Sequence, residues 1–200
     1  MASLDDIDRL EAALPKHLRI VVPLAVWCQL RRGEILGLQR RDICLQELTL
    51  EVRRSRTFDM SGNPIMKAPK SRAGVRSLAI PTEVARRLRE HMEEFVSENE
   101  DAQIVCDGSG RPLSANSLHG HWRRAREKMG VPEIRFHDLR HAGLTYAAAT
   151  GATTVELMHR AGHASAAAAM RYQHAMKDRD RSMAMALDSF ILRNNESNDS

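Results

Sequence analysis

The sequence has few cysteines, few aromatic residues and no long apolar segment, and these scarcities exclude whole classes of protein. Its three cysteines, Cys28, Cys44 and Cys106, are too few and too scattered for a disulfide scaffold or a cysteine-based zinc knuckle. They indicate reduced thiols in a cytosolic protein. The apolar run over residues 20–30 is too short to span a bilayer, and acidic residues at positions 5, 6 and 8 interrupt any signal segment. A secreted disulfide protein and a membrane protein are therefore excluded.

The rest of the composition is that of an ordered domain. Of the 200 residues, 42% are hydrophobic and 28% charged, which argues against disorder. Because only 4% are aromatic, Leu, Ala, Val, Ile and the ten Met are expected to fill the core. The net charge of +4 is unevenly spread. Residues 31–76 and 111–141 are basic and residues 90–101 are acidic, so a face formed by the two basic segments would suit a polyanion.

Hydrophobic periodicity predicts helices around a small sheet. Helices are expected over residues 3–14, 20–30, 32–39, 82–92, 114–129, 138–150, 154–161, 165–172 and 183–191. Alternation of apolar and polar residues predicts strands over 48–52 and 75–80, with a short apolar strand candidate over 103–106 and a turn over 61–64.

Five blocks of chemically distinctive residues follow one another along the chain. They are LRRGEILGL at 30–38, PKSRAGVR at 69–76, RFHDLRH at 135–141, AGH at 161–163 and the tyrosine at 172. His137 and Arg140 are three residues apart, so at the start of a helix they project to the same side. Tyr172 lies nine residues beyond His163.

In these blocks and their order, the sequence resembles the catalytic domain of the tyrosine recombinases, the phage-type integrases. That family carries an L-R-x-x-E-x-L-x-L block, a lysine at a strand turn, an H-x-L-R block, a G-H pair and a nucleophilic tyrosine. The resemblance covers about Ser3 to Tyr172 and departs at Cys28-Gln29, where the family often has Thr-Gly. It implies an α+β fold that is mainly α, of the DNA breaking-rejoining enzyme type, with a small antiparallel sheet of three strands.

The residue types suit the cleavage and rejoining of DNA strands. Resealing a strand without an external energy source needs a covalent protein–phosphate intermediate. The resemblance implies Tyr172 as the nucleophile of a 3′-phosphotyrosyl bond, whereas Tyr146 lies in a small-apolar helical stretch and is expected in the core. Charge spreads over the equatorial oxygens of the transition state, which suits the guanidiniums of Arg31 and Arg140. Arg32 directly follows Arg31, so the first arginine could be misassigned by one residue.

The resemblance assigns the remaining catalytic roles. His137 would be the general base for the tyrosine hydroxyl, whose ordinary pKa is about 10. Lys70 would donate a proton to the departing 5′ oxygen, a role for which Lys67 and Arg72 compete. His163 would donate a hydrogen bond to a non-bridging oxygen. Glu34 either orients the arginine of the first block or is a charge on the helix surface. No metal or cofactor is implied, because the arginines and the lysine supply the positive charge.

Three other functions are left open by the sequence. The i, i+4 pairs His137/His141 and His159/His163 invite a zinc hydrolase, although no Glu follows the first histidine as a metalloprotease would need. A type IB topoisomerase shares much of the chemistry, and a DNA-binding module with a degenerate site is the third alternative. The phage-type blocks and the complete residue set favour a recombinase or integrase for a phage or mobile element.

The domain organisation and partners also follow from the resemblance. We expect a catalytic domain over residues 1–175, and a last helix with a disordered tail over 176–200 whose apolar stripe docks on a neighbouring protomer or on its own domain. The further N-terminal DNA-binding domains of relatives are expected to be absent from this chain. The implied partners are double-stranded DNA, further copies forming a tetramer on DNA, and accessory DNA-bending proteins. The implied setting is cytoplasmic and nucleoid-associated, without a membrane.

Overall fold

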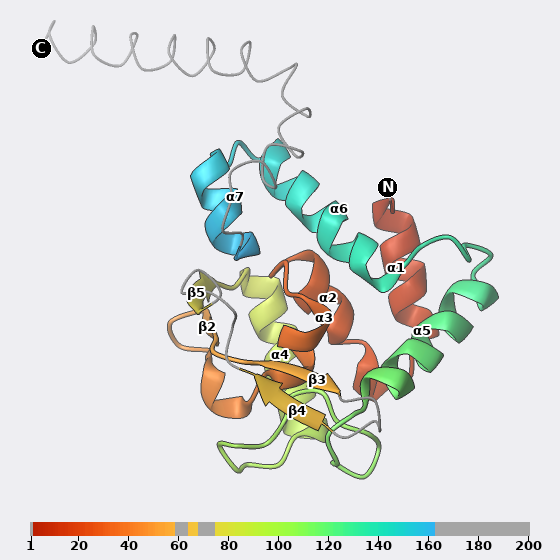
Figure 1. The fold of residues 1–200 in the computed structure, drawn as a ribbon, viewed down its shortest axis with the longest axis vertical. Coiled ribbons are helices and arrows are strands. Elements are labelled where there is room, and N and C mark those ends of the chain that lie inside the picture. Colours follow the sequence, from red (N-terminus) through yellow and green to blue (C-terminus); the bar gives the residue numbers. More distant parts are fainter. Residues whose placement is uncertain (1, 59–63, 68–74, 163–200) are drawn as a thin grey trace, which may run out of the picture.

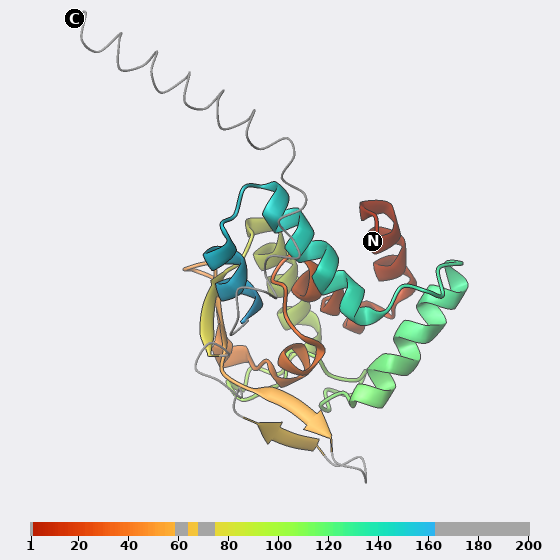
Figure 2. The same cartoon turned by 45° about the horizontal axis from the view of Figure 1, so that its top comes forward.

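The computed structural model describes residues 2–58, 64–67 and 75–162 of the chain (Figure 1). Its helices are α1 Leu4–Ala13, α2 Val21–Val26, α3 Arg32–Gly37, α4 Thr82–Phe95, α5 Ala115–Lys128, α6 Phe136–Ala149 and α7 Thr154–Ala161, with 3-10 turns at Lys16–Leu18 and Arg40–Asp42. Its strands are β1 Ile43–Cys44, β2 Thr49–Val52, β3 Ser55–Phe58, β4 Pro64–Lys67 and β5 Arg76–Ala79. The β3–β4 ribbon lies at the opposite end of the domain from α6 and α7 (Figures 1 and 2).

Local capping explains where several helices begin. At α1, the Ser3 hydroxyl accepts from the Asp6 N–H and the Asp6 carboxylate accepts from the Ser3 N–H, both at 3.1 Å. Thr153 and Glu156 make the same reciprocal pair at the start of α7. Pro81 precedes α4, where its missing N–H and its restricted φ suit a helix start.

The predicted antiparallel sheet of three strands is present, with strand order β1-β2-β5. Leu50 on β2 lies opposite Leu78 on β5, and both side chains are buried. The third strand is the two-residue β1, so the prediction of a strand over 103–106 is wrong. That segment makes only isolated bridges, because Ile104 donates to the Leu38 carbonyl while the Val105 carbonyl accepts from Leu113. Two different neighbours therefore bridge it, and no ladder forms. The β3–β4 pair was not predicted.

The predicted helix over 20–30 is also wrong in its length. The structure ends α2 at Val26, and Gln29 adopts a left-handed backbone conformation with φ of 51°. An L residue in this conformation cannot continue a right-handed helix. The chain turns instead, and the Leu30 N–H donates to the Leu24 carbonyl at 3.1 Å. This turn delivers Arg31 to the start of α3.

The main core lies between α1–α6 and the inner face of the sheet, and a smaller cluster joins α6 to α7. Among the described residues, Met92 is the only methionine in the buried core, so the aliphatic residues fill it with less help from methionine than expected. Tyr146 was expected in the core and packs against its edge as a half-buried side chain, with its ring 5.8 Å from that of Trp27 and its hydroxyl donating to the Ala2 carbonyl. Gly143 lets α6 approach α2 closely, because a Cβ there would lie 1.8 Å from the Val26 carbonyl oxygen.

Several sequence predictions lie outside the described residues. These are the helices over 165–172 and 183–191, the polar tail, and all but the last residue of the turn over 61–64. Within the described ranges, no helix is both long enough and apolar enough to cross a membrane.

Candidate active site

A buried carboxylate, that of Glu34 in the first turn of α3, organises the candidate site. Its two oxygens accept from the Arg31 backbone N–H at 2.8 Å and from the Arg31 guanidinium at 2.9 Å. They also accept two hydrogen bonds from Arg76 of β5, at 3.1 and 3.0 Å, and one lies 4.0 Å from Nη1 of Arg140. Of the two interpretations left open for Glu34, the structure supports the one in which it orients Arg31, because the side chain is only 6% exposed.

The balance of burial and positive charge keeps Glu34 ionised. Burial alone would raise the pKa of its carboxyl group, but hydrogen bonds and charge from Arg76 and Arg31 outweigh burial and lower the pKa below its ordinary value. Three guanidiniums share this carboxylate, so the cluster keeps an excess of positive charge. Such a cluster suits a phosphate group.

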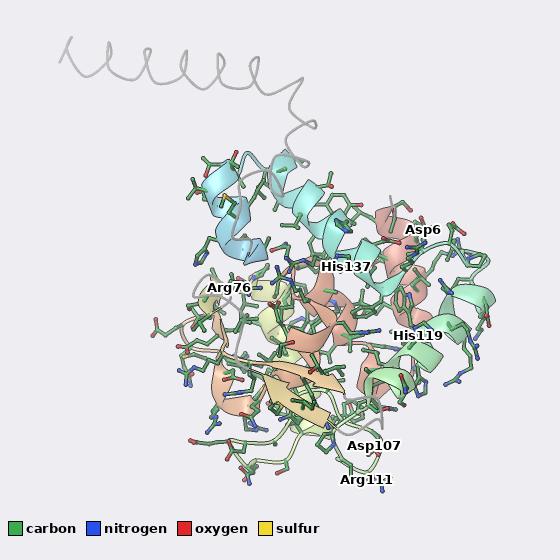
Figure 3. The ribbon with its side chains drawn as sticks, in the orientation of Figure 1. Asp6, Arg76, Asp107, Arg111, His119 and His137 are labelled. Atoms are coloured by element: carbon green, nitrogen blue, oxygen red, sulfur yellow. The ribbon has the colours of Figure 1, made fainter. Side chains whose placement is uncertain are left out.

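The same three arginines converge on the last turn of α7. Arg76 donates to the carbonyl of residue 160 at 3.1 Å, Arg140 to that of residue 161, and Arg31 to that of residue 162 at 3.0 Å. Carbonyls at a helix C-terminus lack partners within the helix, so donors from outside stabilise it. Figure 3 labels Arg76 on β5, beside this last turn. The arginines thereby fix the backbone that leads directly into His163.

Gly162, which ends α7, is required by this close approach. Its φ is 57°, and a Cβ would lie 2.8 Å from Nη1 of Arg76 and 3.2 Å from Nη1 of Arg31. Only a residue without a side chain fits both the conformation and the space.

His137 stands at the start of α6 (Figure 3), and its side chain is open to solvent on one side and partly covered by neighbouring residues. Its ring lies edge-on to that of His141, with the centroids 4.6 Å apart. The pKa of His137 is lowered below the ordinary 6.5, chiefly because the ring is partly buried. The positive charges of His141 and Arg140 lower the pKa further, and the negative charge of Asp138 only partly opposes them. The imidazole is therefore neutral at pH 7, the form that can accept a proton.

The structure brings together Arg31, Glu34 and Arg140, with His137 one helical turn before Arg140 on α6. Of the two neighbouring arginines, Arg31 contacts the cluster and Arg32 is exposed, which favours Arg31 as the arginine of the first block. Three other predicted residues lie outside the described residues: Lys70, His163 and Tyr172. Within the described ranges, no three His, Cys, Asp or Glu side chains are grouped to hold a metal ion.

Sequence reasoning missed Arg76, Arg160 and Gln29. Arg76, Leu78 and Ile80 are two residues apart along the chain, so their side chains lie on the same, inward face of the strand. An arginine at such an inward position indicates a buried partner. The side chain of Arg160 reaches the Gln29 amide and the Trp27 and Ala79 carbonyls, and no sequence pattern predicts these contacts.

A family model described as the phage integrase family matches residues 3–179. The chain belongs to the phage integrase family. It is 38% identical over 197 residues to the putative prophage phiRv2 integrase of Mycobacterium tuberculosis, covering 98% of this chain and 52% of that protein. It is 36% identical over 186 residues to the integrase of Mycobacterium phage L5, covering 92% of this chain and 50% of that protein. The chain thus spans about half the length of these integrases.

Solved structures show the same fold. The Tn1549 transposon integrase, in complex with transposon right end DNA, has a TM-score of 0.77 at 17% identity, over 93% of this chain and 65% of that one. The XerA recombinase has a TM-score of 0.68 at 20% identity, over 92% and 62%. The predicted resemblance to tyrosine recombinases and the predicted fold class are both confirmed.

Proposed function

We propose that this chain is the catalytic part of a site-specific recombinase that integrates or excises a phage or another mobile element. It would cleave and rejoin DNA through a 3′-phosphotyrosyl intermediate. The observation that carries the proposal is that Arg31 and Arg140, which share the Glu34 carboxylate, converge on the backbone before His163 in a member of the phage integrase family. The relatives named integrases, and the DNA bound by the Tn1549 integrase, support the substrate.

In the proposed first step, the Tyr172 oxygen attacks the scissile phosphorus while the bond from phosphorus to the 5′ oxygen breaks. The tyrosine proton passes to the neutral imidazole of His137, and Lys70 protonates the departing oxygen. Rejoining reverses these transfers, with a 5′ hydroxyl attacking the phosphotyrosine. The energy of the broken phosphodiester is thus kept in the covalent bond.

The arginines act on the non-bridging oxygens. The Arg31 side chain is 39% exposed, so it can reach a phosphate from solvent. Arg140 is only 3% exposed, and its terminal nitrogens donate to the carbonyls of Gln29 and Ala161, which fixes the plane of its guanidinium. Positive groups fixed before the charge develops stabilise the transition state without reorganisation. His163 would add a further donor.

The partners follow from the reaction. Exchange between two duplexes requires four strands to be broken, and each chain supplies one nucleophile, so four copies would assemble on DNA. The segment over 176–200 would link neighbouring copies, and accessory proteins that bend DNA would bring the sites together. The setting would be the cytoplasm of a bacterium or an infected host, at the nucleoid.

Covalent trapping tests the proposal. Duplexes with a randomised core and a nick beside each candidate cleavage position would be incubated with the protein, so that the short 5′ fragment diffuses away and the intermediate accumulates. Denaturing gels would compare wild type with Tyr172→Phe and, as a matched control, Tyr146→Phe. We expect covalent DNA for wild type and Tyr146→Phe and none for Tyr172→Phe.

Two results would contradict the proposal. One is covalent DNA that still forms with Tyr172→Phe, and the other is wild-type protein that forms no more covalent DNA than the Tyr172→Phe background. Sequencing of the trapped DNA would then give the preferred site. Strand exchange between two such sites, as opposed to relaxation of supercoils alone, would separate the recombinase from a topoisomerase.

A further inference from the structure

Gln29 occupies a position that a glutamine should avoid. Its φ of 51° is unfavourable for any residue with a Cβ, and its side chain is buried with 3% exposure. Burying a primary amide is costly unless its donors and its acceptor are all bonded. A glycine would adopt this backbone without strain and would bury nothing polar. The side chain must therefore make contacts that offset both costs.

The contacts of the amide are complete. Its nitrogen donates to the carbonyls of Val26 at 2.9 Å and Trp27 at 3.1 Å, and its oxygen accepts from Nε of Arg160 at 2.6 Å. The backbone carbonyl of Gln29 separately accepts from Arg140. Any residue in this conformation would offer that carbonyl, whereas only a side chain of this length reaches Arg160. The contribution specific to glutamine is its bond to Arg160.

Arg160 in turn ties the last turn of α7 to two other elements. Its guanidinium donates to the Trp27 carbonyl at 3.0 Å, at the end of α2, and to the Ala79 carbonyl of β5 at 3.5 Å. Its own backbone carbonyl accepts from Arg76. Arg160 lies three residues before His163, so a shift of its backbone moves the start of the segment that carries His163 and Tyr172.

We propose that Gln29 and Arg160 form a positioning pair for the strand-cleavage reaction. The Gln29 side chain holds Arg160, Arg160 holds the end of α7, and the Gln29 carbonyl holds Arg140, so one strained residue aligns two parts of the site. Among the described residues, the side chains of the pair contact each other and the backbone carbonyls of Val26, Trp27 and Ala79, which is why we assign the pair a positioning role. This inference rests on the proposed function, because the alignment matters for catalysis only if His163 and Arg140 act on a phosphate.

The variant Gln29→Asn isolates the reach of the side chain. Asparagine keeps the amide and tolerates the left-handed conformation, but it is one methylene too short for Arg160. Leu48→Asn is the matched control, because Leu48 has a φ of 50° in the turn before β2. The trapping reaction would be followed in single turnover over a range of concentrations of the selected DNA, which gives the rate at saturation and the half-saturating concentration separately.

We expect Gln29→Asn to lower the saturated rate of covalent complex formation by about tenfold or more, because small displacements of catalytic groups cost that much. The half-saturating DNA concentration should stay unchanged, as should both parameters in Leu48→Asn. The double variant Gln29→Asn/Arg160→Met should be no slower than Arg160→Met alone, since both changes break one link. The pair would be overturned if Gln29→Asn left the saturated rate unchanged or lowered only the affinity for DNA. It would also be overturned if the rate losses of the two single variants multiplied in the double variant.

Hydrogen exchange supplies a readout that does not depend on activity. In the free protein, the amides of α7 should exchange faster in Gln29→Asn than in wild type, while those of α4 stay the same; Leu48→Asn should leave α7 unchanged. If the wild-type protein formed no covalent complex, the proposed function would fail. Hydrogen exchange in α7 would still show whether Gln29 and Arg160 hold the end of that helix. Unchanged exchange in α7 would overturn the pair even with recombination established.

Discussion

Replacing Glu34 by glutamine removes the negative charge that three arginines share while keeping the shape of the side chain. The variant takes the carboxylate charge away from Arg76, whose side chain is 1% exposed, and from Arg140, which is 3% exposed. The glutamine oxygen still accepts hydrogen bonds, but its NH₂ group meets guanidinium N–H groups, which are also donors. The substitution therefore removes a negative charge that compensates buried positive charge.

The expected loss of stability is large. Breaking a buried ion pair by removing one partner costs about 3–5 kcal/mol. The contact to Arg31 adds little to this figure, because that side chain is 39% exposed and screened by solvent. We therefore expect Glu34→Gln to lower the free energy of unfolding by about 3 kcal/mol at pH 7, a large share of the 5–15 kcal/mol typical of a domain.

Urea unfolding of the free protein would measure the loss, with Glu83→Gln as the control. Glu83 also accepts two hydrogen bonds from one arginine, Arg86 at 2.8 and 2.6 Å, but its side chain is 64% exposed. Its replacement should therefore change stability little.

The dependence on pH gives a second measurement. The folded protein holds the pKa of Glu34 below its ordinary 4.5, so the stabilisation is present above that value and disappears as the pH falls through the folded pKa. The difference between wild type and Glu34→Gln should thus be full at pH 7 and shrink below about pH 4.5. Equal stabilities at pH 7, or a difference that does not shrink in acid, would refute the reasoning.

Two further predictions concern packing and proton transfer. Gly143→Ala puts a methyl group 1.8 Å from the Val26 carbonyl oxygen and should cost about 2 kcal/mol or more, measured as a lower melting temperature. Gly120→Ala should instead raise the melting temperature slightly, because among the described residues its methyl group would meet only Nη1 of Arg124, at an ordinary contact distance of 3.6 Å. The pKa of His137 lies below 6.5, so the rate of covalent complex formation should hold at pH 7 and fall only as the imidazole is protonated below pH 6.5. If the rate of covalent complex formation already decreased above pH 7 as the pH was lowered, His137 would be excluded as the base.

Much of the fold is predictable because it rests on local signals. The Ser3/Asp6 cap and the alternation over 48–52 and 75–80 involve neighbouring residues, and the structure has the expected elements there. The errors arise where distant partners decide. Nothing local shows that residues 103–106 are bridged from two directions, or that the chain leaves α2 at Val26 to make the buried turn at Gln29.

The candidate site divides in the same way. The block pattern indicated Arg31, Glu34 and Arg140, because their spacing within each block is a local property. Glu34 could have been a surface charge from sequence alone, since its burial depends on Arg76, 42 residues away. Arg160 was missed for the same reason: its partner Gln29 is 131 residues away, and only the packing of α7 on α2 and β5 brings them together.

The choice of acceptors at this site explains how it is both rigid and charged. A guanidinium can be fixed by carboxylates, but each carboxylate also cancels its charge. Here the three arginines share the carboxylate of Glu34 and donate to the successive carbonyls of residues 160–162, which orient them as neutral dipoles. The negative end of the α7 dipole favours positive charge at that place without neutralising it. A site with one carboxylate for each arginine would be as rigid, yet it would offer a phosphodiester no net charge. Placing the arginines at the end of α7 thus preserves the field that the proposed phosphoryl transfer requires.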